Sequence, residues 1–264
     1  FITNNMTKKI LVLGYKKNQS KIIYYLNQLK NVRVFQTSKR IKPNDAKKFN
    51  LVICFGYRYL LEQEILNQCK YFINLHPSYL PYNRGAYPNF WSFADNTPSG
   101  ITIHQIDKGI DTGKIICQKI LDFELEKNKE KLTFKNTHEK LISELEHMFL
   151  NNIKSLVNCE YESFDQIGKG TYHSTYQLPK ILKSWNQNIF KTIKLYNYQK
   201  NNDINKKLNI LDQIQSTRKN NNVNWMNILR TSIKNSTSET LKIVKRINKD
   251  DNKISNLFKK LNNE

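Results

Sequence analysis

The chain has 264 residues, with 43 Lys and Arg against 22 Asp and Glu and a formal net charge of +21. This length is enough for one α/β domain plus a small appendage, so one sizeable core is expected. No apolar stretch approaches the ~20 residues of a membrane span, and residues 1–5 lack a signal-peptide pattern. We therefore expect a soluble, cytoplasmic protein without a membrane partner.

The basic charge is spread along the whole chain. Residues 203–264 carry 13 Lys and Arg and 6 Asp and Glu, so their share of the excess is roughly proportional to their length. A net charge this high is typical of nucleic-acid or membrane-surface binding. Here the lysines accompany abundant Asn and Ile and form no compact Arg-rich block, which favours a general compositional bias. We expect no nucleic-acid partner.

The four cysteines show no C-x-x-C spacing, so neither a zinc site nor a redox motif is indicated. Cys54 and Cys117 lie in apolar runs and are expected to be core thiols. The sequence therefore predicts no metal and fits a reducing cytoplasm.

The first hundred residues alternate short apolar runs with helical periodicity, the pattern of an α/β fold. We expect strands at 9–13, 32–35, 51–55, 71–75 and 100–106, and helices at 20–29, 62–68 and 88–94. This order predicts a doubly wound, mostly parallel, Rossmann-like sheet. Pro77 and Pro81 exclude regular structure, so residues 77–88 are expected to form a loop over the strand ends, where such sheets place ligands.

The second half of the chain reads as helical. Residues 133–157 have the apolar spacing of one long amphipathic helix. After a polar linker at 201–203, four apolar stripes predict four short helices, with Asp250 or Asp251 capping the last. Such short helices are marginal alone, so we expect this segment to be an interaction or dimerisation element.

Three polar residues are predicted to meet at the strand ends. Asn74 and His76 are two apart at the end of an expected strand, so their side chains share a face. Asp111 lies in a Gly-Ile-Asp-Thr-Gly turn after strand 100–106, and a neighbouring strand would return it to His76. An amide, an imidazole and a carboxylate suit formyl transfer to an amine, which develops an oxyanion and sheds a proton.

At these residues the chain resembles the N10-formyltetrahydrofolate-dependent formyltransferases. This family includes methionyl-tRNA formyltransferase, glycinamide ribonucleotide transformylase and the sugar N-formyltransferases. It carries an Asn, an H-x-S-x-L-P segment and a D-x-G-x-D-T-G segment, matched here by Asn74, His76, Ser78, Leu80, Pro81, Asp107, Gly109, Asp111, Thr112 and Gly113. The flanks 55–59 and 88–93 look most like the sugar nucleotide branch, and residues 170–173 resemble a stretch that closes the core there. The resemblance covers residues 8–194.

The resemblance implies roles for individual residues. Asn74 would hydrogen-bond the formyl oxygen, His76 would stabilise that oxygen or relay the proton, and Asp111 would orient His76 and accept or pass the proton of the amine. The folate donor would lie against Phe55, Gly56, Tyr57, Arg58, Leu60, Asp107 and Gly109. The amine substrate would meet Ser78, Tyr79, Asn83, Arg84 and Tyr87. For His104, a core position and a sugar contact are equally expected.

The change in composition after Tyr198 predicts a catalytic core at 1–198 and a helical extension at 199–264, and the resemblance implies a homodimer. The expected reaction moves a formyl group from N10-formyltetrahydrofolate to a dideoxy-aminosugar nucleotide, best matched by dTDP-4-amino-4,6-dideoxyglucose, for lipopolysaccharide O-antigen or another surface polysaccharide. One alternative is methionyl-tRNA formylation, which the high basicity favours. The expected helical tail disfavours it, because that branch of the family ends in a β-barrel. Another is a non-catalytic binding module with a basic helical tail.

Overall fold

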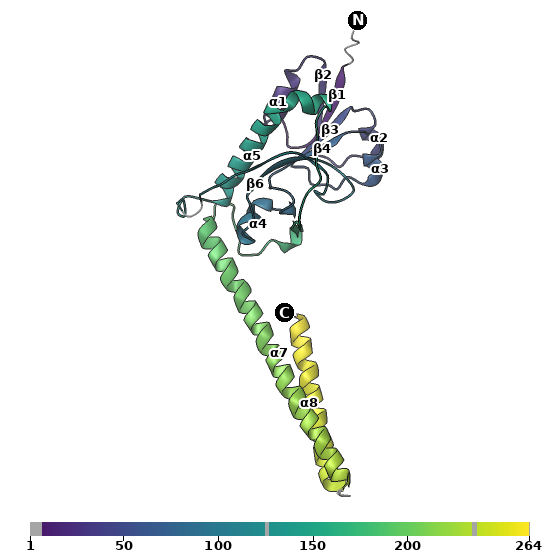
Figure 1. The fold of residues 1–264 in the computed structure, drawn as a ribbon, viewed down its shortest axis with the longest axis vertical. Coiled ribbons are helices and arrows are strands. Elements are labelled where there is room, and N and C mark those ends of the chain that lie inside the picture. Colours follow the sequence, from purple (N-terminus) through teal and green to yellow (C-terminus); the bar gives the residue numbers. More distant parts are fainter. Residues whose placement is uncertain (1–6, 125–126, 234–236, 264) are drawn as a thin grey trace. The chain divides into compact units, whose positions relative to one another are not determined.

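The structure of the chain is a computed structural model that describes residues 7–124, 127–233 and 237–263. Contacts divide the chain into two compact units, one ending at Tyr196 and one beginning at Asn197. The first unit is built around a six-stranded sheet with helices on both faces, and the second consists of most of one long helix and all of another (Figure 1).

The sheet has the order β2-β1-β3-β4-β6-β7. Its strands are β1 (Lys8–Gly14), β2 (Val32–Thr37), β3 (Leu51–Phe55), β4 (Phe72–His76), β6 (Gly100–Gln105) and β7 (Ile115–Ile120). The first four are parallel, whereas β6 runs antiparallel to both β4 and β7. The predicted doubly wound, mostly parallel sheet is confirmed. Strand β7 was not predicted, because its second half is exposed at the sheet edge and its sequence there is polar.

Alternation along β1 explains the two layers of helices. Ile10 and Val12 pack into one apolar cluster with α1 (Ile22–Asn27), α5 (Phe134–Asn151) and α6 (Ile153–Asn158). Leu11 and Leu13 point to the other cluster, which α2 (Pro43–Ala46) and α3 (Gln63–Leu66) cover. Because successive side chains of a strand point to opposite faces, the continuous apolar runs of β1 and β3 are buried on both sides.

The prediction of one long helix over residues 133–157 is wrong, because the chain forms two helices there, α5 and α6. The chain leaves helical geometry at Asn152 (φ −109°, ψ 8°), between α5 and α6. Asn152 Nδ2 donates to the carbonyl of Met148, 2.8 Å away. An asparagine side chain that bonds the nearby backbone competes with the helix, so the apolar stripe continues across the break while the helix does not.

Residues 77–88 are not wholly a loop. They contain β5 (Arg84–Gly85), which pairs in parallel with β8 (Tyr172–His173), and they are followed by α4 (Pro88–Ala94) at the predicted position. A short 3-10 helix, Thr175–Gln177, follows β8. The pairing of β5 with β8 joins segments almost ninety residues apart, so no local pattern predicts it.

The prediction of a linker and four short helices at the end of the chain is wrong. The structure has two helices there, α7 (Ile189–Ile233) and α8 (Thr237–Asn263). No Gly or Pro interrupts residues 189–263, and the polar residues of the expected linker are tolerated inside a helix. Asp250 and Asp251 lie within α8 rather than at its start, and they accept hydrogen bonds from Asn224 and Asn221 of α7.

The two long helices meet along a seam with coiled-coil spacing. The seam buries Ile210, Ile214 and Leu257, with Leu261 packed against them. Thr217 and Asn224 continue the alternating three- and four-residue spacing on α7 and are also buried. Among the described residues no helix is both long and apolar enough to cross a bilayer.

Candidate active site

The carboxyl end of β4 and the strand beside it carry the predicted site. In the β4–β6 ladder Asn74 lies opposite His104, and His76 lies opposite Thr102. The turn after β6 then brings Asp111 back over β4, where its carboxylate lies between both histidines. The structure thus brings the three residues singled out in the sequence to one place, together with His104.

The Asp111 carboxylate is held from several sides. Its Oδ1 accepts a hydrogen bond from Asn74 Nδ2 at 3.0 Å, and its Oδ2 accepts one from the Gly85 backbone N–H at 2.8 Å. His76 Nδ1 lies 3.6 Å from Oδ2, and His104 Nε2 lies 3.5 Å from Oδ1. Burial opposes ionisation, but attraction to His76 and His104 in their protonated forms, together with the hydrogen bond from the Gly85 N–H, outweighs it and holds the Asp111 pKa well below its ordinary value. Asp111 is therefore a carboxylate at neutral pH.

His76 is a neutral, buried imidazole. Its Nε2 lies 3.1 Å from the carbonyl oxygen of Asn83, and because a carbonyl only accepts, Nε2 carries the proton. Nδ1 is then the unprotonated nitrogen, and it faces Asp111. Burial lowers the pKa of His76, against the opposing effect of the Asp111 charge. The ring can therefore take up a proton at Nδ1 and share it with the carboxylate.

His104 links Asn74 to the rest of the site. Its Nδ1 lies 2.7 Å from the carbonyl of Gln105 and carries the proton, so Nε2 accepts from Asn74 Nδ2 at 3.2 Å. Both Asn74 N–H groups are thus used, one by His104 and one by Asp111. Asn74 gains a donor for another oxygen only when one of these two bonds gives way.

These side chains form part of the wall of an open cavity of about 950 Å³. Most of the residues predicted from the sequence line it: Asn74, His76, Asp111, His104, Gly56, Tyr57, Arg58, Leu60, Asp107, Gly109 and Tyr87. The cavity is bounded by the loop after β3, the turn after β6, the start of α4 and residues 172–185.

Five predicted residues do not line the cavity: Phe55, Ser78, Tyr79, Asn83 and Arg84. Phe55 is buried in the core with its ring 4.8 Å from that of Tyr15. Ser78 Oγ donates to the carbonyl of Tyr82, and Asn83 is fully buried, with its amide bonded to Thr97. Tyr79 is half-buried beside Gly100, and Arg84 points to Gln166. Ser78, Tyr79, Asn83 and Arg84 thus lie outside the cavity lining, and their contacts with substrate stay a prediction.

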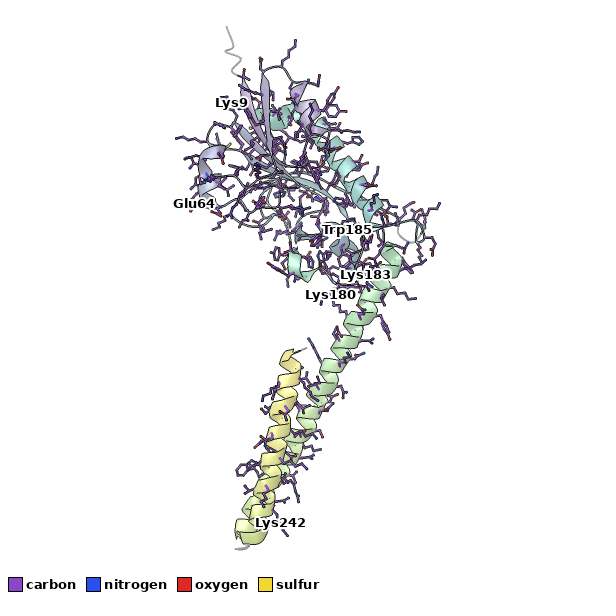
Figure 2. The ribbon with its side chains drawn as sticks, turned by 180° about the vertical axis from the view of Figure 1, so that it is seen from behind. Lys9, Glu64, Lys180, Lys183, Trp185 and Lys242 are labelled. Atoms are coloured by element: carbon purple, nitrogen blue, oxygen red, sulfur yellow. The ribbon has the colours of Figure 1, made fainter. Side chains whose placement is uncertain are left out.

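One part of the cavity lining was not predicted from the sequence. It is aromatic and comes from residues 172–185, which carry Tyr172, His173, Tyr176 and Trp185. The Trp185 ring lies 5.8 Å from that of Tyr87, and Figure 2 shows Trp185 close to Lys180 and Lys183 at the same end of the unit. In the sequence, the sign of this part of the lining was a group of aromatic residues outside any helical or strand periodicity.

Two contacts hold the His173 side chain in this part of the lining. Its ring stacks on Trp91 with centroids 3.9 Å apart, and its Nε2 lies 2.8 Å from Asp95 Oδ2. Among the described residues no cluster of three or more His, Cys, Asp or Glu side chains could hold a metal ion. Cys54 also reaches the cavity wall, where burial raises its pKa and keeps it a thiol.

Comparison with known families accounts for this arrangement. The family model described as formyl transferase matches residues 4–145, more than half of the chain. The chain belongs to the formyl transferase family. Its matched region contains the strands that carry Asn74, His76 and His104 and the turn that carries Asp111.

Solved structures place the fold among the sugar formyltransferases of this family. The formyltransferase PseJ from Anoxybacillus kamchatkensis, solved with UDP-4,6-dideoxy-4-formamido-L-AltNAc and tetrahydrofolate, is 30% identical with a TM-score of 0.60. The match covers 70% of this chain and 97% of PseJ. A 4-N formyltransferase from Francisella tularensis is 22% identical with a TM-score of 0.59, over 71% of this chain and 86% of that one, and supports the fold alone.

Curated relatives of two kinds match the sequence. A dTDP-4-amino-4,6-dideoxyglucose formyltransferase of Mycobacterium bovis is 27% identical over 45% of this chain and 51% of its own length. A methionyl-tRNA formyltransferase of Caldicellulosiruptor saccharolyticus is 30% identical over 63% of this chain and 50% of its own length. The chain thus spans about half the length of these curated relatives.

Proposed function

We propose that this chain transfers a formyl group from N10-formyltetrahydrofolate to the amino group of a sugar nucleotide. The observation that carries the proposal is the convergence of Asn74, His76 and Asp111 on the wall of one open cavity. A carboxylate beside a neutral imidazole removes a proton from an amine, and an amide N–H stabilises a developing oxyanion.

The proposed donor supplies the formyl carbon, and the residues of the chain manage charge and protons. As the amine nitrogen bonds to that carbon, Asn74 redirects an N–H to the formyl oxygen. Asp111 accepts the proton that the nitrogen loses, and His76 Nδ1 shares it across the 3.6 Å between them. The same pair returns a proton to the folate nitrogen as its bond to the formyl carbon breaks. The products are the formamido sugar and tetrahydrofolate.

The volume and lining of the cavity support two ligands that meet at Asp111. One part of its lining comes from the loop after β3, with Tyr57, Arg58 and Leu60, and from the turn from Asp107 to Asp111. We assign this part to the folate. The aromatic wall of residues 172–185, with Tyr87, is the part for the nucleotide, because aromatic rings stack on bases. PseJ, solved with a UDP-sugar and tetrahydrofolate, provides a precedent for such a pair.

For the acceptor we propose dTDP-4-amino-4,6-dideoxyglucose first, on the likeness to the mycobacterial enzymes, with other dideoxy-aminosugar nucleotides next. The product would enter lipopolysaccharide O-antigen or related surface polysaccharide synthesis in the cytoplasm. A mass-spectrometric assay of the full chain tests this with N10-formyltetrahydrofolate and a panel of dTDP-, UDP- and GDP-aminosugars. We expect one sugar nucleotide to gain a single formyl group, and none when the donor is omitted.

Methionyl-tRNA formylation is the second candidate, favoured by the relative from Caldicellulosiruptor saccharolyticus. Initiator methionyl-tRNA therefore belongs in the same assay. If only the tRNA is formylated, methionyl-tRNA formylation replaces our proposal. If no acceptor is formylated and the chain captures an acidic partner or nucleic acid in a salt-sensitive way, the result favours a binding module with a basic helical tail.

We further propose that residues 1–198 form the catalytic core and that residues 199–264 mediate a homodimer. On α7, Ile204, Leu208 and Leu211 are each about half exposed and lie at three- and four-residue spacing, outside the seam with α8. A second helical hairpin of the same chain would cover this stripe. We expect light scattering to show a dimer that Leu208→Glu with Leu211→Glu converts to a monomer. Val223→Glu, at an equally exposed site outside the stripe, is the matched control; a dimer that survives the double substitution would contradict this interface.

A further inference from the structure

The backbone at Asp111 has an unfavourable conformation. Its φ is +52°, in the left-handed region that residues with a Cβ seldom adopt. The turn that carries it must therefore be held by contacts from outside the turn. The Asp111 side chain contributes one such contact through Gly85, but the backbone carbonyls on either side of the bend need their own partners.

Gln166 provides these partners. Its Nε2 donates to the carbonyl of Asp111 and to the carbonyl of Gly113, each at 2.8 Å. The residue is half-buried and belongs to the segment after α6, where Phe164 forms a two-hydrogen-bond bridge with Ile115 at the start of β7. Gln166 therefore reaches the turn from a segment that is fixed to the edge of the sheet.

The orientation of the Gln166 amide is determined by its neighbours. Its Oε1 accepts from Arg84 Nε at 3.1 Å and from Arg84 Nη2 at 2.6 Å. Arginine only donates and the two carbonyls only accept, so the oxygen must face Arg84 and the nitrogen must face the turn. All four hydrogen bonds would be lost or reversed in the flipped amide. We call these four hydrogen bonds the Gln166 clamp.

The Gln166 clamp also reaches the other side of Asp111. Arg84 precedes Gly85, whose N–H donates to Asp111 Oδ2 at 2.8 Å. Gln166 thus connects the backbone of the turn to the short strand β5 that supplies a hydrogen bond to the carboxylate. The carboxylate and its donor are set relative to each other by one side chain that itself lies outside the cavity lining.

We propose that Gln166, held by Arg84, is a positioning residue for Asp111. The proposal rests on the proposed function, since it gives Gln166 a role in formyl transfer through Asp111. Gln166 touches no reacting group. It lies beyond residues 4–145, the part of the chain that the formyl transferase family model matches.

The decisive variant is Gln166→Glu, which keeps the size of the side chain and its contact with Arg84. It replaces the two N–H donors by a carboxylate oxygen that faces two carbonyls, so the turn loses its clamp. Misplacing a catalytic group by about 1 Å costs on the order of 10²-fold in rate. We expect kcat to fall by about 10- to 100-fold, with the KM values of both substrates changed less than about twofold.

The matched control is Gln118→Glu. Gln118 is also half-buried, and its Nε2 donates to the carbonyl of Leu80 at 2.9 Å, so the substitution makes the same chemical change away from Asp111. We expect its kcat to stay close to that of the unsubstituted protein. An equal loss of kcat in both variants would assign the effect to general destabilisation and overturn the proposal.

A second measurement does not depend on the acceptor. Titration of the Asp111 carboxyl carbon by NMR reports its pKa directly in the full chain. We expect Gln166→Glu to raise this pKa and Gln118→Glu to leave it unchanged. If no acceptor is formylated by the unsubstituted protein, the proposed function fails while this titration still tests the clamp. The positioning role of Gln166 would be refuted if Gln166→Glu left the Asp111 pKa unaltered and kept kcat within about twofold of the unsubstituted protein.

Discussion

Replacing Asp111 with asparagine is expected to reduce kcat for formyl transfer by about 10²- to 10⁴-fold, the usual size of a general acid–base contribution. The substituted side chain still accepts from Gly85 through its amide oxygen, but it has no charge with which to take the proton of the amine. The variant should therefore fold and bind both substrates. Single-turnover kinetics with the best acceptor of the panel would separate this loss of chemistry from a loss of binding.

Asp122→Asn is the matched control for this prediction. Asp122 is exposed in the loop after β7, where its Oδ1 accepts from the backbone of Glu124. An asparagine retains that bond, so turnover should be unaffected. Turnover of Asp111→Asn within about tenfold of the unsubstituted protein would show that the proton leaves by another route.

His76→Asn is expected to lower kcat by at least about 10²-fold. The asparagine retains a polar group near Asn83 and Asp111 but has no nitrogen that takes up a proton at neutral pH. His147→Asn, an identical change at an exposed position of α5, should have no effect. Equal kcat values for the two variants would remove His76 from the mechanism.

His76→Asn also tests the protonation state of His76, through the pH dependence of the free energy of unfolding. The folded-state pKa of His76 is lowered, so between that value and the unfolded value of ~6.5 the unfolded chain binds more protons. The free energy of unfolding should therefore rise with pH through this window and fall as the solution is acidified. His76→Asn should flatten this dependence without abolishing it, because burial also lowers the pKa of His138. Urea unfolding at several pH values measures the difference.

The helical tail shows where local pattern was insufficient. The stripes at Leu208, Leu211 and Ile214 and at Ile254 and Leu257 were visible, and they do lie on helices. The polar residues between the stripes predict helix ends, because Asn and Asp side chains that bond the local backbone compete with a helix. In α7 and α8 they bond across the hairpin instead. Whether these side chains bond the local backbone or the other helix depends on the position of that helix, which the pattern in one segment does not reveal.

The sequence by itself determined the parts of this protein that depend on local spacing. Alternation and apolar runs predicted the sheet, and the positions of Asn74, His76 and Asp111 at strand and turn ends predicted that they meet. Only the tertiary structure decided which residues surround them. Gln166, His173 and Trp185 reach the site through pairings between segments far apart in the chain, and Asn83 and Arg84 turn away from it for the same reason. Long-range pairing leaves no periodic signal in either segment, because its energy comes from the partner.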